Sequence, residues 1–199
     1  ESLKLSPLPC RGDRPLAVFS QVKVQYCGRD VCGPVSFALH PGERVVLDGK
    51  NGSGKSSLLK VLLGESIPHS GTITTSAGLV VSYVPQDTAH LNGLLSHFAE
   101  KHHLDESLFK GILRKMGFER VQFEKKMEDF SAGQKKKVLL AASLCQPAHL
   151  YVWDEPLNFV DLHTRLQITS LLRQAQPTML FVEHDRAFQE EIATQKISL

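Results

Sequence analysis

The amino-acid sequence predicts an α/β fold, in which helices cover both faces of a parallel sheet. The first observation is that short apolar runs alternate with segments of helical pattern along the chain. The second is a glycine-rich loop at 49–56, which separates an apolar run from a helical one. The third is a stretch from about 88 to 145 whose pattern is helical, which we expect to be an insertion. We therefore expect a linker or tail at 1–15 and one folded domain at 16–199.

Strands are expected mainly in the first half of the chain. Residues 16–26 alternate between apolar and polar side chains, as a strand with one buried face does. The runs at 35–40 and 44–48 are expected to be two further strands, joined by a Pro-Gly-Glu turn. The pair 70–71 indicates a turn before Thr-Ile-Thr, and 79–84 is an apolar run typical of a buried strand.

Helices with recognisable ends follow. Asp105 can cap a helix at 106–116, and Gly117 can end it. Another helix should begin near Gly133 and end before Gln146, because the residue before a proline disfavours the helical conformation. The other expected elements, in chain order, are a helix directly after the 49–56 loop, a strand at 149–153, a helix at 161–174 and a strand at 178–183.

Composition narrows the class of protein. The chain has 199 residues, of which 42% are hydrophobic and 22% charged, enough for one compact domain with its own core. The net charge of +2 does not indicate a nucleic-acid-binding protein. No apolar run approaches the ~18–20 residues of a membrane span, and the first residues lack the pattern of a signal peptide. The four cysteines include no Cys-x-x-Cys pair, which favours reduced thiols over a disulfide or metal site.

The loop at 49–56 reads Gly-Lys-Asn-Gly-Ser-Gly-Lys-Ser and matches the phosphate-binding pattern G-x-x-x-x-G-K-[ST] at every fixed position. Gly52 and Gly54 let the backbone curl, so that its N–H groups surround phosphate oxygens at the positive end of the next helix. Lys55 can reach the β- and γ-phosphates, and Ser56 offers a hydroxyl to Mg²⁺. The predicted ATP-binding residues of this segment are Gly49, Lys50, Asn51, Gly52, Ser53, Gly54, Lys55, Ser56 and Ser57.

A pair of acids follows a later apolar strand. Asp154 and Glu155 end the run Leu-Tyr-Val-Trp-Asp-Glu, and consecutive side chains at a strand end point in different directions. Asp154 can therefore hold Mg²⁺, directly or through water, while Glu155 polarises the attacking water as general base. Alone, such a pair is more often a solvated turn. The phosphate loop upstream favours the catalytic interpretation.

Further motifs stand in the order known from the ATP-binding-cassette (ABC) ATPases. Phe-Ser-Ala-Gly-Gln at 130–134 resembles the signature loop of that family, usually written L-S-G-G-Q. Tyr26 resembles the aromatic residue that stacks on adenine, and Gln86 resembles the Q-loop glutamine that senses Mg²⁺ and the γ-phosphate. Asp161 matches the D-loop, and His184 matches the switch histidine.

The resemblance covers nearly all of 16–199 and implies a P-loop NTPase fold. Its expected parts are a RecA-like parallel sheet core, an antiparallel β subdomain and a helical signature subdomain. It implies Mg²⁺-dependent ATP hydrolysis, with ATP and Mg²⁺ as cofactors. The implied catalytic residues are Glu155, His184 and Gln86, and the implied Mg²⁺ site consists of Ser56, Gln86 and Asp154.

The resemblance also implies that the signature loop serves another cassette's nucleotide. In ABC ATPases two cassettes pack head to tail, and each signature loop closes over the ATP on the partner's phosphate loop. Ser131 would cap the following helix and contact the γ-phosphate, the N–H of Gly133 would add a donor, and Gln134 completes the loop. Ala132 stands where glycine is commoner, and because alanine tolerates positive φ poorly, we expect slightly weaker closure. The implied partner is a second cassette, on the same longer chain or in a homodimer.

Two phrases resemble the ABC-F branch of the family. The chain reads Glu-Pro-Leu-Asn-Phe-Val-Asp at 155–161 and Val-Glu-His-Asp at 182–185, where transport ATPases typically have forms such as EPTSALD and THD. Segments 104–116 and 130–168 look most like the second cassette of Lsa/Vga-type antibiotic-resistance proteins. Such proteins have no membrane domain, bind the ribosome near the tRNA exit site, and use an interdomain linker to dislodge antibiotics. The resemblance therefore implies a cytoplasmic, ribosome-associated protein that contacts ribosomal RNA and no membrane.

Two other functions stay open. The same catalytic residues would serve the ATPase subunit of an ABC membrane transporter, which needs a partner with membrane spans. The third function is a binding module with little turnover, because an isolated cassette cannot complete either composite site. We expect such a fragment to bind ATP and to hydrolyse it slowly.

Lys135, Lys136 and Lys137 open the helix after the signature loop, where their charge opposes the helix dipole. The simplest interpretation is a solvated face. The alternative is that some of them face phosphate, either of a nucleotide across the dimer or of ribosomal RNA. His102 and His103 have no partner at metal-ligand spacing, so the sequence predicts no zinc site there.

Overall fold

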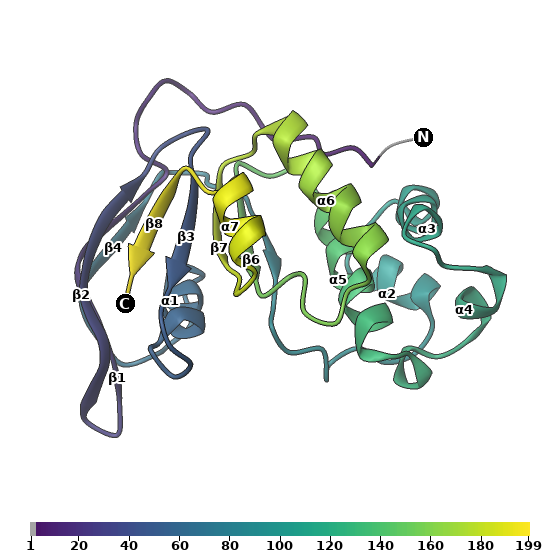
Figure 1. Cartoon of the computed structure of the whole chain (residues 1–199), viewed down its shortest axis with the longest axis horizontal. Coiled ribbons are helices and arrows are strands. Elements are labelled where there is room, and N and C mark those ends of the chain that lie inside the picture. The colour runs from purple at the N-terminus through teal and green to yellow at the C-terminus, as the bar shows by residue number, and fades with distance from the viewer. Residues whose placement is uncertain (1–2) are drawn as a thin grey trace.

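A five-stranded parallel sheet lies at the centre of the molecule (Figure 1), in a computed structural model that describes residues 3–199. The strand order is β5-β6-β7-β3-β8, and every neighbouring pair runs parallel. The carboxyl ends of the strands therefore meet at one edge, where ligands of α/β sheets usually bind. The strands are β3 (Arg44–Asp48), β5 (Val81–Val84), β6 (Leu150–Asp154), β7 (Met179–Val182) and β8 (Gln195–Ser198). This confirms the predicted α/β fold.

An antiparallel sheet of three strands lies beside the parallel one, in the order β2-β1-β4. These strands are β1 (Ala17–Tyr26), β2 (Arg29–Leu39) and β4 (His69–Thr75). Cys27 and Gly28 join β1 to β2 with φ of 50° and 74°, the left-handed conformations of a two-residue hairpin turn. This tight turn lets β2 begin well before the expected start at 35. The turn expected at 70–71 is part of β4, because His69–Thr75 completes the hydrogen bonding on the second edge of β1.

Alternate side chains of the central strands enter two different cores. In β6, Tyr151 and Trp153 join a cluster on the side of the helical lobe, whereas Leu150 and Val152 join a cluster with the antiparallel sheet. This is the period-two alternation of a strand with both faces buried. Since all of β6 is buried, the acid at its end, Asp154, is carried into the protein interior.

The helices form the layers around the sheets and a lobe on one side of them (Figure 1). Asp105 caps α3, accepting a hydrogen bond from the N–H of Leu108 at 2.8 Å, as predicted. The short and polar α7 and β8 lack a periodic pattern, so no sequence signal predicts them. Within residues 3–199, no helix has both the length and the hydrophobicity of a bilayer span. The helices are α1 (Lys55–Leu62), α2 (Leu95–Lys101), α3 (Glu106–Lys115), α4 (Arg120–Glu124), α5 (Ala132–Cys145), α6 (Leu162–Ala175) and α7 (Arg186–Ile192).

Helix α5 connects the helical lobe to the parallel sheet. Near its end, the hydroxyl of Ser143 lies 2.6 Å from the hydroxyl of Ser82 on β5 and accepts a hydrogen bond of 2.9 Å from Nε1 of Trp153 on β6. All three side chains are buried, so each satisfies a polar group that would otherwise lack a partner. This network fixes the carboxyl end of α5 against the sheet, while its amino end reaches the edge where the carboxyl ends of the strands meet.

The N-terminal segment packs along the domain. Leu3 is 4% exposed and belongs to the core on the side of the helical lobe. Further on, the N–H of Leu8 donates to the carbonyl of Ala148 at 2.8 Å. The first two residues of the expected linker, 1–2, lie outside the described residues. From Leu3 to residue 15 the segment runs across the top of the view in Figure 1.

Candidate functional site

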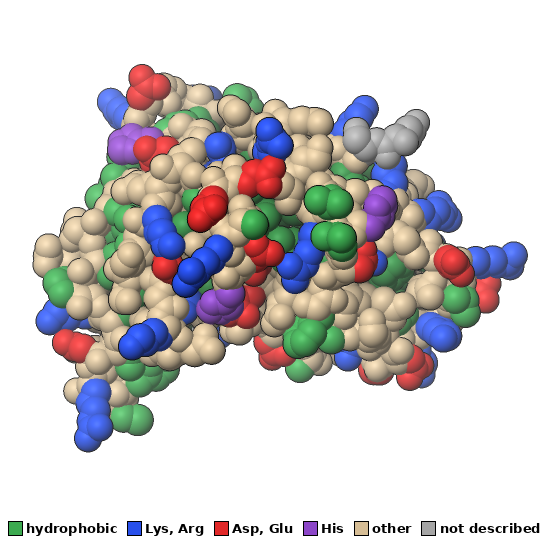
Figure 2. All heavy atoms as spheres, in the orientation of Figure 1, with side chains coloured by type: hydrophobic (Ala, Val, Ile, Leu, Met, Phe, Trp, Pro, Cys, Tyr) green, Lys and Arg blue, Asp and Glu red, His purple; other side chains and the backbone are tan. Residues whose placement is uncertain are grey.

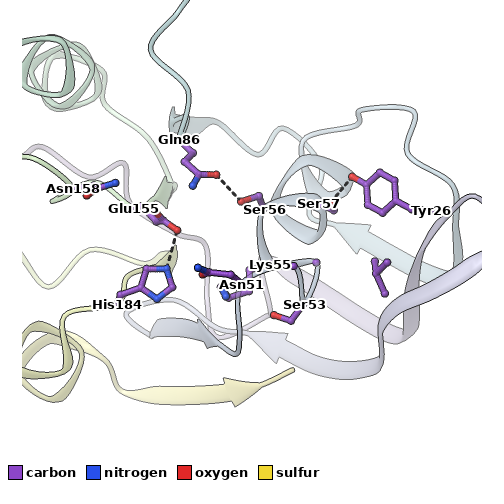
Figure 3. A pocket seen from close by; sticks show the side chains of 13 residues that line it. Tyr26, Asn51, Ser53, Lys55, Ser56, Ser57, Gln86, Glu155, Asn158 and His184 are labelled. Atoms are coloured by element: carbon purple, nitrogen blue, oxygen red, sulfur yellow. Dashed lines mark hydrogen bonds and ion pairs between the residues drawn. The ribbon is translucent and has the colours of Figure 1, made fainter. Parts of the chain in front are cut away.

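A cavity of about 730 Å³ opens at the carboxyl edge of the parallel sheet (Figure 3). Its walls come from the end of β1, the start of β2, the glycine-rich loop with α1, and the loops that follow β5, β6 and β7. Segments far apart in sequence therefore converge on one site. The lining residues are Tyr26, Val31, Asn51, Gly52, Ser53, Gly54, Lys55, Ser56, Ser57, Gln86, Glu155, Asn158 and His184.

The glycine-rich loop has the backbone shape that binds anions. Gly52 and Gly54 have φ of 81° and 85°, a region that side chains with a Cβ rarely adopt. Gly54 is the N-cap of α1 and has no capping side chain. Helical bonding begins with the N–H of Leu58 donating to Gly54, so the N–H groups of 55–57 have no acceptor inside the helix. These free donors, at the positive end of the α1 dipole, can bind phosphate oxygens.

Two side chains of the same loop are poised for an anion. The ammonium of Lys55 donates to the carbonyls of Gly49 and Lys50 at 2.6 and 2.9 Å, so it curls back over its own loop. The hydroxyl of Ser53 is buried and has no hydrogen-bond partner in the part of the chain that the structure describes. A Cβ at position 49 would lie 2.7 Å from that hydroxyl and 3.1 Å from the carbonyl oxygen of Leu199, so a larger residue there would crowd the loop. A phosphate group would offer acceptors to both Lys55 and Ser53.

Tyr26 forms one wall of the cavity. Its hydroxyl lies 2.6 Å from the hydroxyl of Ser57 on α1, and this contact fixes the direction in which the side chain points (Figure 3). The residue is 49% exposed, so one face of the ring is free to stack on a flat group such as adenine. Ser57, which was predicted to bind ATP, lines the cavity, and its hydroxyl pairs with the tyrosine. Val31 completes this apolar end of the cavity.

Asp154 is completely buried, and within residues 3–199 neither of its carboxylate oxygens has a hydrogen-bond partner. Burial raises the pKa of Asp154, although the nearby hydroxyl of Ser56 opposes the shift. A second cavity, of about 390 Å³, is lined by Asp154, Ser56 and Gln86 together. The hydroxyl of Ser56 lies 3.4 Å from Oε1 of Gln86, which is long for a hydrogen bond but close to the spacing of about 3 Å between neighbouring oxygens around Mg²⁺. These oxygen donors and the unpaired carboxylate fit a Mg²⁺ ion.

Glu155 points into the cavity instead of into the interior. Its Oε1 lies 2.9 Å from Nε2 of His184, and the two residues come from the ends of adjacent strands, β6 and β7 (Figure 3). The side chain of Glu155 is 13% exposed and that of His184 49%, so the pair lies at the mouth of the cavity. Glu155 has φ of 50°, an unusual conformation for a residue other than glycine. This backbone turn separates the directions of Asp154 and Glu155, as the sequence predicts.

Glu183 is a functional candidate that the sequence analysis missed. Its buried carboxylate accepts hydrogen bonds from the N–H of Leu157 at 3.1 Å and of His184 at 3.0 Å. Burial raises the pKa of Glu183, and these backbone donors oppose the shift. The side chain therefore holds the loop after Glu155 next to the loop that carries His184. The signal in the sequence is its place in the Val-Glu-His-Asp phrase, directly before His184.

Two other residues around this loop were also missed. Asn158 lines the cavity, and it lies within the phrase 155–161 that the sequence analysis singled out. Arg165 on α6 donates to the carbonyl of Leu157 at 3.1 Å and to the carboxylate of Asp185 at 3.0 Å. Its guanidinium thus bridges the loops that follow β6 and β7. An arginine within a helix gives no sequence signal for such a contact.

The signature loop lies outside this cavity, since none of its residues is among the described lining. Ser131 caps α5 as predicted, accepting from the N–H of Gln134 at 3.1 Å, and the side chain of Gln134 accepts from the N–H of Ser131 at 3.0 Å. Ala132 is the first residue of α5 and does not have positive φ, so the expected cost of alanine there is wrong. A Cβ at Gly133 would lie 2.5 Å from the carbonyl oxygen of Phe159, which is why that position requires glycine.

Lys136 does not lie on a solvated face. It is 2% exposed, and its ammonium donates to the carbonyls of Pro85 and Gln86 at 3.3 and 3.1 Å. Burial lowers the pKa of Lys136, and the carboxylate of Asp154 is the main charge that opposes the shift. The lysine therefore links the signature helix to the segment that carries Gln86.

Lys137 is also engaged, with a side chain that is 13% exposed. Its ammonium donates to the carbonyl of Met116 at 2.7 Å and pairs with the carboxylate of Asp161 at 2.5 Å. Asp161 caps α6, and although burial opposes its ionisation, hydrogen bonds from Lys137 and Thr164 lower its pKa to about 2. The interpretation of a solvated lysine face is thus wrong for Lys136 and Lys137, whereas Lys135 is partly exposed.

Comparison with known proteins identifies the family. The family model described as ABC transporter matches residues 32–158. The probable ATP-binding protein YheS of Escherichia coli K12 is 32% identical over 178 residues, which are 86% of this chain and 28% of YheS. The zinc import ATP-binding protein ZnuC of Buchnera aphidicola is 32% identical over 182 residues, 87% of this chain and 76% of ZnuC. The ribosome protection protein VmlR of Bacillus subtilis is 30% identical over 167 residues, 81% of this chain and 30% of VmlR.

This chain spans less than a third of the length of YheS and of VmlR. Among solved structures, a bacterial Atm1-family ABC exporter with ATP bound matches 100% of this chain and 39% of its own, with a TM-score of 0.80 and 18% identity. At that identity the match shows a shared fold. The matched range of the family model contains the phosphate loop and the acids after β6. The chain therefore belongs to the ABC transporter family, as one of its ATP-binding cassettes.

Proposed function

We propose that the chain is a Mg²⁺-dependent ATPase cassette. The observation that carries the proposal is the contact of 2.9 Å between Glu155 and His184, at the mouth of a cavity whose floor is the phosphate loop. The triphosphate of ATP would lie on the free N–H groups of α1, with Lys55 turning from its own carbonyls to the phosphates. The adenine would stack on the exposed face of Tyr26.

The two acids after β6 have different tasks in this proposal. Glu155 acts as general base and polarises the attacking water, and His184 fixes the orientation of its carboxylate. Ser56, Gln86 and Asp154 are the residues that would hold Mg²⁺. When bound, Mg²⁺ neutralises negative charge that develops on the β- and γ-phosphate oxygens. Asp154 suits this task because its buried carboxylate oxygens accept no hydrogen bond within residues 3–199.

The active unit in this proposal is a pair of cassettes. Ser131 is exposed and the signature loop lies outside its own nucleotide cavity, so its donors are available to a second cassette. Phe159 and Leu162, in and after the loop that follows β6, are 70% and 71% exposed. Figure 2 shows exposed hydrophobic side chains over this part of the surface. An exposed apolar patch of this kind favours contact with another protein surface.

We further propose that the cassette belongs to an ABC-F protein that acts on the ribosome and confers antibiotic resistance by ribosomal protection. Support comes from the phrases at 155–161 and 182–185 and from the similarity to VmlR, which is named a ribosome protection protein. In this proposal the full-length protein is cytoplasmic, carries a second cassette, and contacts ribosomal RNA near the tRNA exit site. ATP-driven closure of the two cassettes would then dislodge the antibiotic that is bound to the ribosome.

Sedimentation of the full product of the gene tests this proposal. With ATP and Mg²⁺, a Glu155→Gln variant should stay bound to ribosomes through a sucrose cushion, because closure is retained and hydrolysis is blocked. The wild-type protein should be released after turnover. A protein that sediments with membranes and never with ribosomes contradicts the ABC-F assignment but leaves the ATPase assignment standing.

The ATPase subunit of a membrane transporter is the second candidate. The observation in its favour is the similarity to ZnuC, of whose length this chain covers 76%. In this case the cavity of about 390 Å³ beside Gln86 would receive a segment of the membrane partner. Co-purification with a protein that has membrane spans would favour this candidate over the ribosome.

A further inference from the structure

The segment after β5 has little backbone support of its own. Strand β5 ends at Val84, and its ladder with β6 ends there too. Residues 85–88 have neither helical nor strand structure. The carbonyls of Pro85 and Gln86 instead accept hydrogen bonds from the ammonium of Lys136. This lysine lies on α5, which is distant from them in sequence. One buried side chain thus replaces the ladder just where Gln86 must be positioned.

Lys136 also lies close to the signature loop. It is in the second turn of α5, shortly after Ser131, which caps the helix. An α-helix is rigid over so short a distance, so a displacement of the signature loop moves Lys136 with it. Lys137, the next residue, binds Asp161 in the loop after β6. The amino end of α5 therefore contacts both loops that carry groups of its own nucleotide site.

We propose that Lys136 is a positioning residue for the Mg²⁺ site, holding Gln86 toward Ser56 through two hydrogen bonds from the signature helix. The inference rests on the proposed function, since it assigns the oxygen of Gln86 to Mg²⁺. It goes further, because it links the position of the signature loop to the Mg²⁺ site of the same cassette. Without Lys136, Gln86 loses its fixed distance to Ser56, while the phosphate loop itself is unchanged.

Hydrogen exchange on the nucleotide-free protein tests the tether without any turnover. Lys136→Met keeps the length of the side chain and removes its donors, so amide exchange in residues 85–90 should become roughly tenfold faster. Lys137→Met is the matched control. Lys137 also lies on α5 and donates to a backbone carbonyl, but that carbonyl belongs to Met116 and not to residues 85–90. Equal exchange in residues 85–90 for both variants would overturn the proposal.

Nucleotide affinity tests the consequence for Mg²⁺. With a fluorescent ATP analogue, Lys136→Met should bind as wild type in EDTA and lose most of the gain in affinity that Mg²⁺ gives. Lys136→Arg, which keeps donors for the two carbonyls, should recover part of that gain. The variant Gln86→Ala should show the same loss, and adding Lys136→Met to it should change nothing further. An additive loss in the double variant, or equal weakening with and without Mg²⁺, would contradict the proposal.

These readouts separate two kinds of failure. If the wild-type protein binds ATP but does not hydrolyse it, the proposed ATPase function fails, while the exchange and affinity tests still decide the role of Lys136. If Lys136→Met does not fold, Lys136→Arg decides. Faster amide exchange in residues 85–90 of Lys136→Arg, with a gain in ATP affinity from Mg²⁺ equal to that of wild type, would show that the tether does not affect Mg²⁺ binding.

Discussion

Asp154 shows the conflict between stability and function at the level of one residue. It is completely buried, and its two carboxylate oxygens have no hydrogen-bond partner among the described residues. We therefore predict that Asp154→Asn stabilises the protein by about 1–3 kcal/mol, because the cost of a buried charge that accepts no hydrogen bond exceeds its attraction to Lys136. The melting temperature of the metal-free protein should rise by several degrees, while Mg²⁺-dependent ATP hydrolysis is lost.

The same residue predicts a pH dependence. Burial raises the pKa of Asp154 above its ordinary value of 3.8, so the folded state binds a proton more strongly than the unfolded state does. Below pH ~4 the carboxyl is neutral in both states and its ionisation has no cost. As the pH rises through the folded-state pKa, the buried carboxyl loses its proton, and the free energy of unfolding falls. The advantage of Asp154→Asn, measured by denaturant unfolding, should therefore grow from pH 4 to pH 7. An advantage that is constant with pH would mean that Asp154 is not the source.

Glu155, unlike Asp154, has a hydrogen-bond partner within the site, which is His184. We predict that Glu155→Gln slows hydrolysis by roughly 100-fold to 10,000-fold, the usual contribution of a general base. Its affinity for ATP should stay near that of wild type, because the shape of the side chain is kept. Glu124→Gln, at an exposed position on α4, is the control and should hydrolyse ATP at the wild-type rate. Undiminished hydrolysis in Glu155→Gln would show that another group activates the water.

The roles of site residues could be predicted from the sequence where the residues that act together are close in sequence. The phosphate loop and the two acids after β6 have fixed spacing, so their geometry follows from local structure. Glu183 and Arg165 could not be predicted in this way, because their partners belong to other elements of the fold. The conformation of Ala132 was predicted incorrectly for a related reason. Its φ is set by the start of α5, not by the glycine that is commoner in the family.

Among the elements, α5 connects the helical lobe, the parallel sheet and two of the loops around the cavity. Its amino end contacts the segment after β5 through Lys136 and the loop after β6 through Lys137, and its carboxyl end binds β5 and β6 through Ser143. The run of lysines predicted a helix facing water because the sequence does not show which neighbours surround it. The limits of α5 were predicted well, since Ser131 and the proline after Gln146 are local signals.

The contact between α5 and the loop after β6 gives a test with a matched pair of glycines. A Cβ at Gly133 would lie 2.5 Å from the carbonyl oxygen of Phe159, so Gly133→Ala must shift that loop. Gly111 in α3 has open space around the same position, and Gly111→Ala should stabilise the protein by about 0.5–1 kcal/mol. We predict that Gly133→Ala lowers hydrolysis at least roughly tenfold and leaves ATP affinity unchanged. Isotope-edited spectra of 157–161 should shift in Gly133→Ala and not in Gly111→Ala. Unshifted spectra in both variants would contradict the close approach.

At the scale of the whole molecule, the two groups of functional residues face different ways. The phosphate loop, Glu155 and His184 surround one cavity, whereas the signature loop lies outside it. The sequence contains both motifs but does not give their relative orientation, which depends on how the helical lobe packs on the sheet. In the proposed pair of cassettes, each active site therefore takes its phosphate loop from one cassette and its signature loop from the other.

Mixing two inactive variants tests this arrangement. Lys55→Met removes the phosphate-binding lysine and leaves the signature loop intact, whereas Gly133→Ala does the reverse. In a mixed pair, one composite site combines the intact phosphate loop of one variant with the intact signature loop of the other. An equal mixture should therefore recover roughly a quarter of the wild-type rate, since half of random pairs are mixed and each has one intact site of two. The rate per cassette of the wild-type chain should also rise with protein concentration. If the mixture stays as inactive as its components, while wild type has the same rate per cassette at every concentration, then each cassette works alone and the signature loop has another role.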